Sequence, residues 1–215
     1  MIIAIDGSAA SGKGTLAKRV AIELGYDYLD TGALYRAVAL SLLITGTNSK
    51  NIDEKQAVDA ALTLDLSLTQ TAEIRTDKVA ALASIVAAIS PVRAELLALQ
   101  RAFAAAPPSD KGVVLDGRDI GTIVLPDADL KFFIDADLDI RAERRTKELL
   151  QAGQSVMFRD VLADMKARDD RDRTRLVAPL KAAADSITID TSKMDAAEVL
   201  ALALSHIYRV CPSEQ

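Results

Sequence analysis

The chain has 215 residues, of which half are hydrophobic, and its net charge is −5. This length fits one domain with or without inserts, and the apolar fraction is large enough to bury a sizeable core. The acidic balance argues against nucleic-acid binding as the main role, and one His with one Cys excludes a His-rich metal site.

The first fifteen residues combine a strand, a glycine-rich loop and the start of a helix. Residues 2–5 are uncharged and mostly β-branched, which favours a buried strand. The pattern Gly7-x-x-x-x-Gly12-Lys13 follows, and apolar residues at helical spacing come next. In this order the backbone N–H groups and the helix N-terminus can surround phosphate oxygens. We expect Lys13 to bind the β- and γ-phosphates and a nearby hydroxyl to bind Mg²⁺.

The residue after Lys13 departs from the general phosphate-loop pattern. That pattern has Ser or Thr there, whereas this chain has Gly14 and only then Thr15. The variant Gly-Lys-Gly-Thr resembles the loop of the nucleoside monophosphate kinases. The alternative is a glycine-rich turn that binds nothing, and the strand-to-helix context argues against it.

A second helix is expected shortly after the first. Gly25 ends the first helix, residues 26–29 are a candidate strand, and Asp30 or Thr31 is a candidate N-cap for a helix reaching about Ile44. A helix cap alone would explain Asp-Thr-Gly. However, Arg36 lies just over one turn into this helix, where it could reach an anion near the phosphate loop.

Residues 46–110 are predicted to form an α-rich insert. The expected elements are a short helix at 53–62, a short strand at 64–68, a helix at 77–89, and another from Pro91 to the prolines at 107 and 108. Along 77–89 the apolar residues share one helical face and Ser84 lies opposite. The residues on that face are Val79, Leu82, Ile85, Val86 and Ile89. The residues alone favour plain solvent exposure for Ser84.

The second half alternates strands with helices. Strands are expected at 113–116, 130–134 and 187–189, and helices at 138–150, from about 155, and at 195–208. This alternation predicts a mostly parallel sheet covered on both faces. Arg118 and Asp119 follow the strand at 113–116 at its carboxyl end, where such sheets bind ligands. Asp116 is a candidate for orienting Mg²⁺-bound water, although a strand-end residue that caps the next turn is the alternative.

An arginine-rich run lies in the helix after residue 155. Arg168, Arg171 and Arg175 have i, i+3, i+7 spacing and share one face. Such runs usually form a solvated, salt-bridged surface. Together with Lys13, Arg36 and Arg118, however, they could surround two phosphorylated ligands with cations. Direct phosphoryl transfer requires this arrangement, so the sequence predicts an ATP-dependent kinase for a small phosphorylated acceptor.

Motifs along nearly the whole chain, taken together, resemble those of the bacterial cytidylate kinases. In chain order they are Gly7-Ser-Ala-Ala-Ser-Gly-Lys-Gly-Thr15, Asp30-Thr-Gly-Ala-Leu-Tyr-Arg36, Ser84 with Pro91-Val-Arg93, Asp116-Gly-Arg-Asp-Ile-Gly121, and Arg168-Asp-Asp-Arg-Asp-Arg-Thr-Arg175 with Ala178-Pro179-Leu180. The resemblance implies an α/β phosphate-loop NTPase fold and phosphorylation of CMP and dCMP by ATP with Mg²⁺.

The resemblance also implies roles for the matched residues. The ATP phosphates would be held by Gly7, Ser8, Ala9, Ala10, Ser11, Gly12, Lys13, Gly14 and Thr15, with Thr15 also a candidate Mg²⁺ ligand. The acceptor would be bound by Thr31, Arg36, Ser84, Arg93, Arg118, Asp119, Arg168, Asp172 and Arg175. Among these, Arg36, Arg118 and Arg175 would hold the CMP phosphate, Ser84, Arg93 and Asp119 would read cytosine, and Arg168 and Asp172 would contact sugar and phosphate. Lys13, Arg118, Arg168 and Arg175 are the expected catalytic residues.

The expected organisation is a single kinase domain. Its core would comprise residues 1–45, 111–146 and 176–215, with an NMP-binding insert at about 46–110 and a lid at about 147–175. The segment 69–74 is shorter than is usual in the family, which predicts a reduced sheet in the insert, and Pro91 is not where the family most often has proline. We expect a cytoplasmic protein that binds neither nucleic acid nor membrane, because the net charge is acidic, no apolar run reaches spanning length and the N-terminus has no basic signal region. The resemblance implies a monomer.

Two other functions are consistent with a phosphate loop. A kinase of the same fold could act on UMP, AMP or a non-nucleotide acceptor. A nucleotide-dependent switch or ATPase would turn over ATP without an acceptor, but the sequence has no Asn-Lys-x-Asp motif and no strand ending in Asp-Glu.

Overall fold

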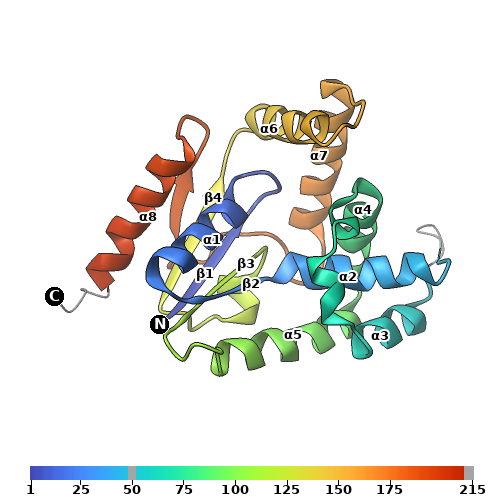
Figure 1. Cartoon of the computed structure of the whole chain (residues 1–215), viewed down its shortest axis with the longest axis horizontal. Coiled ribbons are helices and arrows are strands. Elements are labelled where there is room, and N and C mark those ends of the chain that lie inside the picture. Colours follow the sequence, from blue (N-terminus) through green and yellow to red (C-terminus); the bar gives the residue numbers. More distant parts are fainter. Residues whose placement is uncertain (48–51, 211–215) are drawn as a thin grey trace. The chain divides into compact units, whose positions relative to one another are not determined.

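The computed structural model of the chain describes residues 1–47 and 52–210 (Figure 1). The chain divides into two compact units. The first consists of Met1–Leu29, Pro107–Thr174 and the chain from Ala178 onward, and the second of Asp30–Ala106 with Arg175–Val177. Cys211 lies outside the described residues.

A five-stranded sheet forms the centre of the first unit. Its strands are β1 (Ile2–Gly7), β2 (Asp27–Asp30), β3 (Val113–Gly117), β4 (Leu130–Asp135) and β5 (Ile187–Asp190), in the order β2-β3-β1-β4-β5. β1 pairs in parallel with both β3 and β4, and β4 pairs in parallel with β5. The expected parallel sheet is confirmed, and its register sets Asp6 beside Gly117 and Gly7 beside Ile134.

The described residues of the first unit form the helices α1 (Lys13–Leu24), α6 (Leu138–Gln151), α7 (Phe158–Thr174) and α8 (Ala196–Val210). A five-residue π-helical segment, η3 (Ile120–Val124), follows β3. The main core packs residues of β1, β3 and β4 against apolar side chains of α1 and α8, and no Trp contributes to it. A smaller cluster joins α6 and α7 through Ala142, Leu149, Val161 and Met165.

The second unit is helical. Its elements are α2 (Thr31–Ile44), α3 (Glu54–Leu62), the 3₁₀ turns η1 (Leu66–Gln70) and η2 (Glu73–Arg75), α4 (Asp77–Val86) and α5 (Ser90–Ala105). The strand expected at 64–68 is wrong, because η1 occupies this segment. The Asp65 carboxylate accepts a hydrogen bond from the Ser67 backbone N–H at 2.9 Å, which closes a turn. Leu66 is 51% exposed, so no buried face supports a strand.

The boundary and the face of α4 also differ from the expectation. The helix ends at Val86 rather than at residue 89, because Ile89 is extended and precedes α5, which has a proline in its first turn. Val79, Leu82, Ala83 and Val86 form its buried face, whereas Ile85 is 39% exposed. Ser84 is half-buried rather than fully exposed.

Within the described residues, no single helix has the length and apolar character needed to cross a membrane. α4 and α5 reach that length and composition only as a pair, and the chain bends by 99° between them.

Candidate active site

The phosphate loop (residues 7–15) is a tight connection between β1 and α1. A Cβ on Gly7 would lie 2.0 Å from the carbonyl oxygen of Ile134 in the neighbouring strand, so only glycine fits there. Gly12, the N-cap of α1, has a φ of 91°. Ala10 also has a positive φ, 56°, which costs a non-glycine residue roughly 1 kcal/mol. The surrounding structure therefore imposes the shape of this loop.

Side chains of the loop bond back onto its own backbone and onto β4. The Ser11 hydroxyl donates to the Ser8 carbonyl at 3.0 Å, and the Ser8 hydroxyl donates to the Asp135 carboxylate. The Lys13 ammonium also donates to the Ser8 carbonyl, at 3.4 Å. The Lys13 side chain is thus folded over the loop, and the long bond is one that a phosphate oxygen can replace.

Asp116, near the end of β3, lies beside the first turn of α1. Its carboxylate accepts a hydrogen bond from the Tyr28 hydroxyl at 2.6 Å. A Cβ on Gly14 would lie 3.6 Å from its other oxygen, so the carboxylate is close to the residue that separates Lys13 from Thr15.

These oxygen donors fit Mg²⁺, which prefers carboxylate, hydroxyl, phosphate and water oxygens. The described residues contain no group of three or more His, Cys, Asp or Glu side chains able to hold a metal. Mg²⁺ in proteins is usually held by one or two carboxylates together with substrate phosphates and water.

Arg118 and Asp119 lie directly after β3. Arg118 Nε donates to the Asp172 carboxylate of α7 at 3.0 Å, and one of its terminal nitrogens donates to the Gly117 carbonyl at 3.2 Å. Both partners of the ion pair are mostly buried, with 17% and 7% of their side chains exposed. Asp119 is buried as well. The end of β3 and α7 thus bring together three of the residues that the sequence singled out.

Asp6 is a buried carboxylate that the sequence analysis missed. Its two oxygens accept hydrogen bonds from the backbone N–H groups of Ile120 and Gly121, both at 2.8 Å. Burial raises the pKa of Asp6 from the ordinary 3.8 to about 7, and the charge of Asp119 acts in the same direction, while the backbone bonds and Arg118 oppose it. The available signal was an acidic residue at the end of an uncharged buried strand.

Asp6 fixes the turn that carries Arg118 and Asp119. Its two bonds tie β1, one residue before the phosphate loop, to the segment that follows β3. The same carboxylate therefore holds the two edges of the candidate site in a fixed relation within the first unit.

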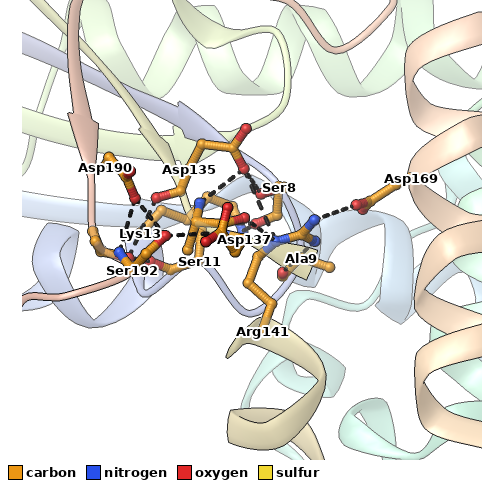
Figure 2. A network of polar contacts seen from close by, with 12 residues as sticks. Ser8, Ala9, Ser11, Lys13, Asp135, Asp137, Arg141, Asp169, Asp190 and Ser192 are labelled. Carbon is orange, nitrogen blue, oxygen red and sulfur yellow. Dashed lines mark hydrogen bonds and ion pairs between the residues drawn. The ribbon is translucent and has the colours of Figure 1, made fainter. Parts of the chain in front are cut away.

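Figure 2 shows a second polar network around the phosphate loop, which the sequence analysis did not identify. Arg141 of α6 donates to the Ala9 carbonyl at 3.2 Å and forms an ion pair with Asp169 of α7 at 2.7 Å. Arg173 of α7 reaches the Asp135 carboxylate at 3.3 Å. Within the run at 168–175, Arg173 therefore pairs with Asp135 of β4, and Asp169 pairs with Arg141 of α6.

In the second unit, Arg36 is held at the start of α2. Asp30 is the N-cap, and its carboxylate accepts a hydrogen bond from the Ala33 N–H at 2.9 Å. The same carboxylate binds Arg36 at 2.7 Å. Among the described residues, Arg36 Nε is buried without a hydrogen-bond partner. Thr31, the first residue of the helix, is 3% exposed.

Arg93 of α5 is buried in the second unit. One of its terminal nitrogens donates to the Ala87 carbonyl at 3.3 Å, and its guanidinium lies over the Tyr35 ring at 5.7 Å from the centroid. Tyr35 precedes Arg36 on α2, so these contacts link two predicted acceptor-binding arginines.

The predicted site residues divide between the two units. The phosphate loop, Asp116, Arg118, Asp119, Arg168 and Asp172 belong to the first unit. Thr31, Arg36, Ser84, Arg93 and Arg175 belong to the second. The structure describes the geometry within each group, and the roles of the individual residues stay predictions.

The comparisons with known proteins decide the family. The sequence model of the cytidylate kinase family matches residues 3–209. The chain belongs to the cytidylate kinase family. A cytidylate kinase of Paramagnetospirillum magneticum is 52% identical over 206 residues, which cover 96% of this chain and 97% of that protein. A cytidylate kinase of Rhodospirillum rubrum is 51% identical over 205 residues, with 95% of each chain covered.

Solved structures agree on the fold. An uncharacterised protein of Eubacterium ventriosum superposes with a TM-score of 0.55 at 18% identity, covering 96% of this chain and 98% of that one. A gluconokinase of Sinorhizobium meliloti gives a TM-score of 0.50 at 15% identity, covering 97% and 91%. With the parallel sheet and the loop geometry, this likeness confirms the α/β phosphate-loop fold.

Proposed function

We propose that this protein transfers the γ-phosphoryl group of ATP to CMP and to dCMP, forming ADP with CDP or dCDP. The observation that carries the proposal is the glycine-dependent phosphate loop with Lys13 folded over it, in a chain that matches the cytidylate kinase family over residues 3–209. In such reactions the protein performs little covalent chemistry and acts by positioning and charge stabilisation.

The donor is bound by the phosphate loop. Its backbone N–H groups and the N-terminus of α1 surround the phosphates, and Lys13 exchanges its long bond to the Ser8 carbonyl for a phosphate oxygen. Thr15 and Asp116 would hold Mg²⁺, with Asp116 acting through water. When bound, Mg²⁺ neutralises phosphate charge during transfer.

The acceptor is assigned to a set of residues separate from the phosphate loop. Arg36, Arg118 and Arg175 hold the CMP phosphate, and the buried Arg36 Nε, which has no hydrogen-bond partner within the described chain, supports an anion ligand there. Cytosine is read by Ser84, Arg93 and Asp119. Arg168 and Asp172 contact the sugar and its phosphate. Thr31, at the start of the helix that carries Arg36, also binds the acceptor.

The transferring group is stabilised by cations. The charge that spreads over the equatorial oxygens is stabilised by Lys13, Arg118, Arg168 and Arg175. The ion pair with Asp172 preorganises Arg118 for this role. Residues 147–175 act as a lid that excludes water and prevents ATP hydrolysis. The lid, the insert at 46–110, a monomeric state and a cytoplasmic location are parts of the same proposal.

The experiment is product identification with a matched pair of lysine variants. Wild-type protein, Mg-ATP and CMP should give ADP and CDP in equal amounts by ion-exchange chromatography. Lys13→Ala should reduce kcat about 10²–10³-fold, because one preorganised charge at the transferring group is lost. Lys55→Ala, at an exposed lysine of α3, serves as the control and should leave the rate unchanged. Wild-type rates in Lys13→Ala would refute the assignment of the phosphate loop.

A further inference from the structure

Arg141 of α6 forms bonds to three separate parts of the first unit. Its Nε donates to the Ala136 carbonyl at 2.8 Å, one terminal nitrogen donates to the Ala9 carbonyl at 3.2 Å, and the other pairs with Asp169 at 2.7 Å (Figure 2). Its side chain is 3% exposed and that of Asp169 is 8% exposed. A guanidinium fixed in this way can impose geometry on each of its partners.

The bond to Ala9 acts on the backbone of the phosphate loop. Ala9 precedes Ala10, whose φ of 56° is unfavourable for a residue with a Cβ. The Ala9 carbonyl and the Ala10 N–H belong to one planar trans peptide, so they point in opposite directions. By holding the carbonyl, Arg141 directs the Ala10 N–H away from α6 and maintains the left-handed conformation that follows.

The bond to Asp169 acts on α7. Asp169 follows Arg168 in the chain and lies one turn before Asp172, whose carboxylate holds Arg118 at 3.0 Å. A second ion pair joins the same helix to the loop region, because Arg173 contacts Asp135, which accepts the Ser8 hydroxyl. Arg141 thus contacts both the loop backbone and α7 directly.

We propose that Arg141 is a positioning residue that orients the Ala10 N–H of the phosphate loop and couples the loop to α7 through Asp169. It acts without touching either substrate. The identity of the loop's ligand, ATP, rests on the proposed function. Through this coupling, the positions of Arg168 and Asp172 on α7 depend on the conformation of the phosphate loop, and the loop conformation depends on the position of α7.

The test uses variants that preserve charge or shape. Arg141→Lys keeps a cation near Asp169 but cannot donate to three divergent acceptors. Asp169→Asn keeps an oxygen that can accept from Arg141. The other oxygen, Oδ1, has no hydrogen-bond partner among the described residues, so replacing it with NH₂ breaks no bond seen there. Both variants should therefore fold, which an unfolding midpoint would verify.

Affinity for Mg-ATP is measured by titration calorimetry without any acceptor, and kcat/KM for ATP is measured at saturating CMP. Arg141→Lys should weaken ATP binding about tenfold or more, because a small displacement of the loop removes phosphate contacts. Asp169→Asn should have a smaller effect in both measurements. The double variant should bind ATP no more weakly than Arg141→Lys alone, because the two residues act through one contact.

An exposed ion pair on α7 provides the control. Arg159 and Asp160 lie 3.4 Å apart with 76% and 65% of their side chains exposed, so Arg159→Lys and Asp160→Asn should change ATP affinity by less than about twofold. An equally small effect of Arg141→Lys, or strictly additive effects of Arg141→Lys and Asp169→Asn, would overturn the proposal. A lowered unfolding midpoint with unchanged ATP affinity would reduce Arg141 to a structural role. CMP turnover by the wild-type protein decides the proposed function separately.

Discussion

At the scale of single residues, Asp6 is a buried carboxylate with a raised pKa that binds the turn carrying Arg118 and Asp119. Its pKa of about 7 means that the folded protein binds a proton there that the unfolded chain, with a pKa near 3.8, has released. Stability from this group is therefore fully present below about pH 4 and is lost as the pH rises through 7. The charge of Asp119 raises the pKa of Asp6 and that of Arg118 lowers it, and the side chain of Lys131, which pairs with Asp185, lies close to Gly121.

We predict that the free energy of unfolding of wild-type protein falls relative to Asp6→Asn as the pH rises from 5 to 8. The full effect of the shift is on the order of 4 kcal/mol, of which this interval covers most. Asn cannot ionise, so the variant lacks this dependence, although it loses one backbone bond at every pH. Urea unfolding at several pH values measures both proteins, and groups common to the two cancel in the difference. Parallel stability profiles would show that Asp6 does not titrate in this range.

The sequence identified candidate functional residues whose interactions are local in the chain, and it missed those that bond to distant segments. Lys13 and Arg118 follow from short patterns at strand ends, whose chemistry is local. Asp6 and Arg141 do not, because each acts through backbone groups more than a hundred residues away in the chain, at Ile120 and at Ala9. Periodicity contains no information about such pairings, so only a bond to a distant segment reveals them.

At the scale of elements, α4 provides a direct test of what buries a helix face. Leu82 is fully buried, whereas Ile85, which the apolar pattern placed on the same face, is 39% exposed. We predict that Leu82→Ala destabilises the protein by about 2–5 kcal/mol, because it leaves a cavity in the second unit. Ile85→Ala should cost less than about 1 kcal/mol. Thermal or urea unfolding compares them, and equal losses would contradict the packing described for α4.

Strong local signals predicted most elements well, and weak ones failed. β1, β3 and β4 were predicted because each contains a short run rich in β-branched or aromatic residues, which the fold buries on both faces. The segment 64–68 alternates apolar and polar residues as a half-buried strand does, but its Asp65 side chain bonds to Ser67 and starts a 3₁₀ turn. A hydrogen bond within a single turn therefore outweighed the alternating pattern. A pattern of only five residues is too short to predict a strand reliably.

At the scale of the whole molecule, the division of the chain differs from simple sequence boundaries. The second compact unit begins at Asp30 and includes Arg175–Val177, whereas the sequence analysis expected an insert from residue 46. α2 packs against α3 and α4, and this tertiary packing places it in the second unit. Composition could not reveal this, because α2 follows directly from β2 with no linker between them.

The proposed kinase function requires that phosphoryl transfer depend on an acceptor. The predicted substrate residues include a set assigned to the acceptor as well as the phosphate loop, so ATP turnover should require an acceptor whose phosphate and base fit that set. A switch or an ATPase with the same phosphate loop would turn over ATP alone, and a kinase of different specificity would prefer another acceptor.

The most direct test is a coupled ADP-release assay with Mg-ATP and, separately, CMP, dCMP, UMP, AMP, GMP or no acceptor. We predict strong turnover with CMP and dCMP, weak turnover with UMP and none without acceptor. Preference for a different acceptor would keep the fold and the phosphate loop but contradict the roles proposed for Ser84, Arg93 and Asp119. Equal ADP release without any acceptor would contradict the kinase function itself.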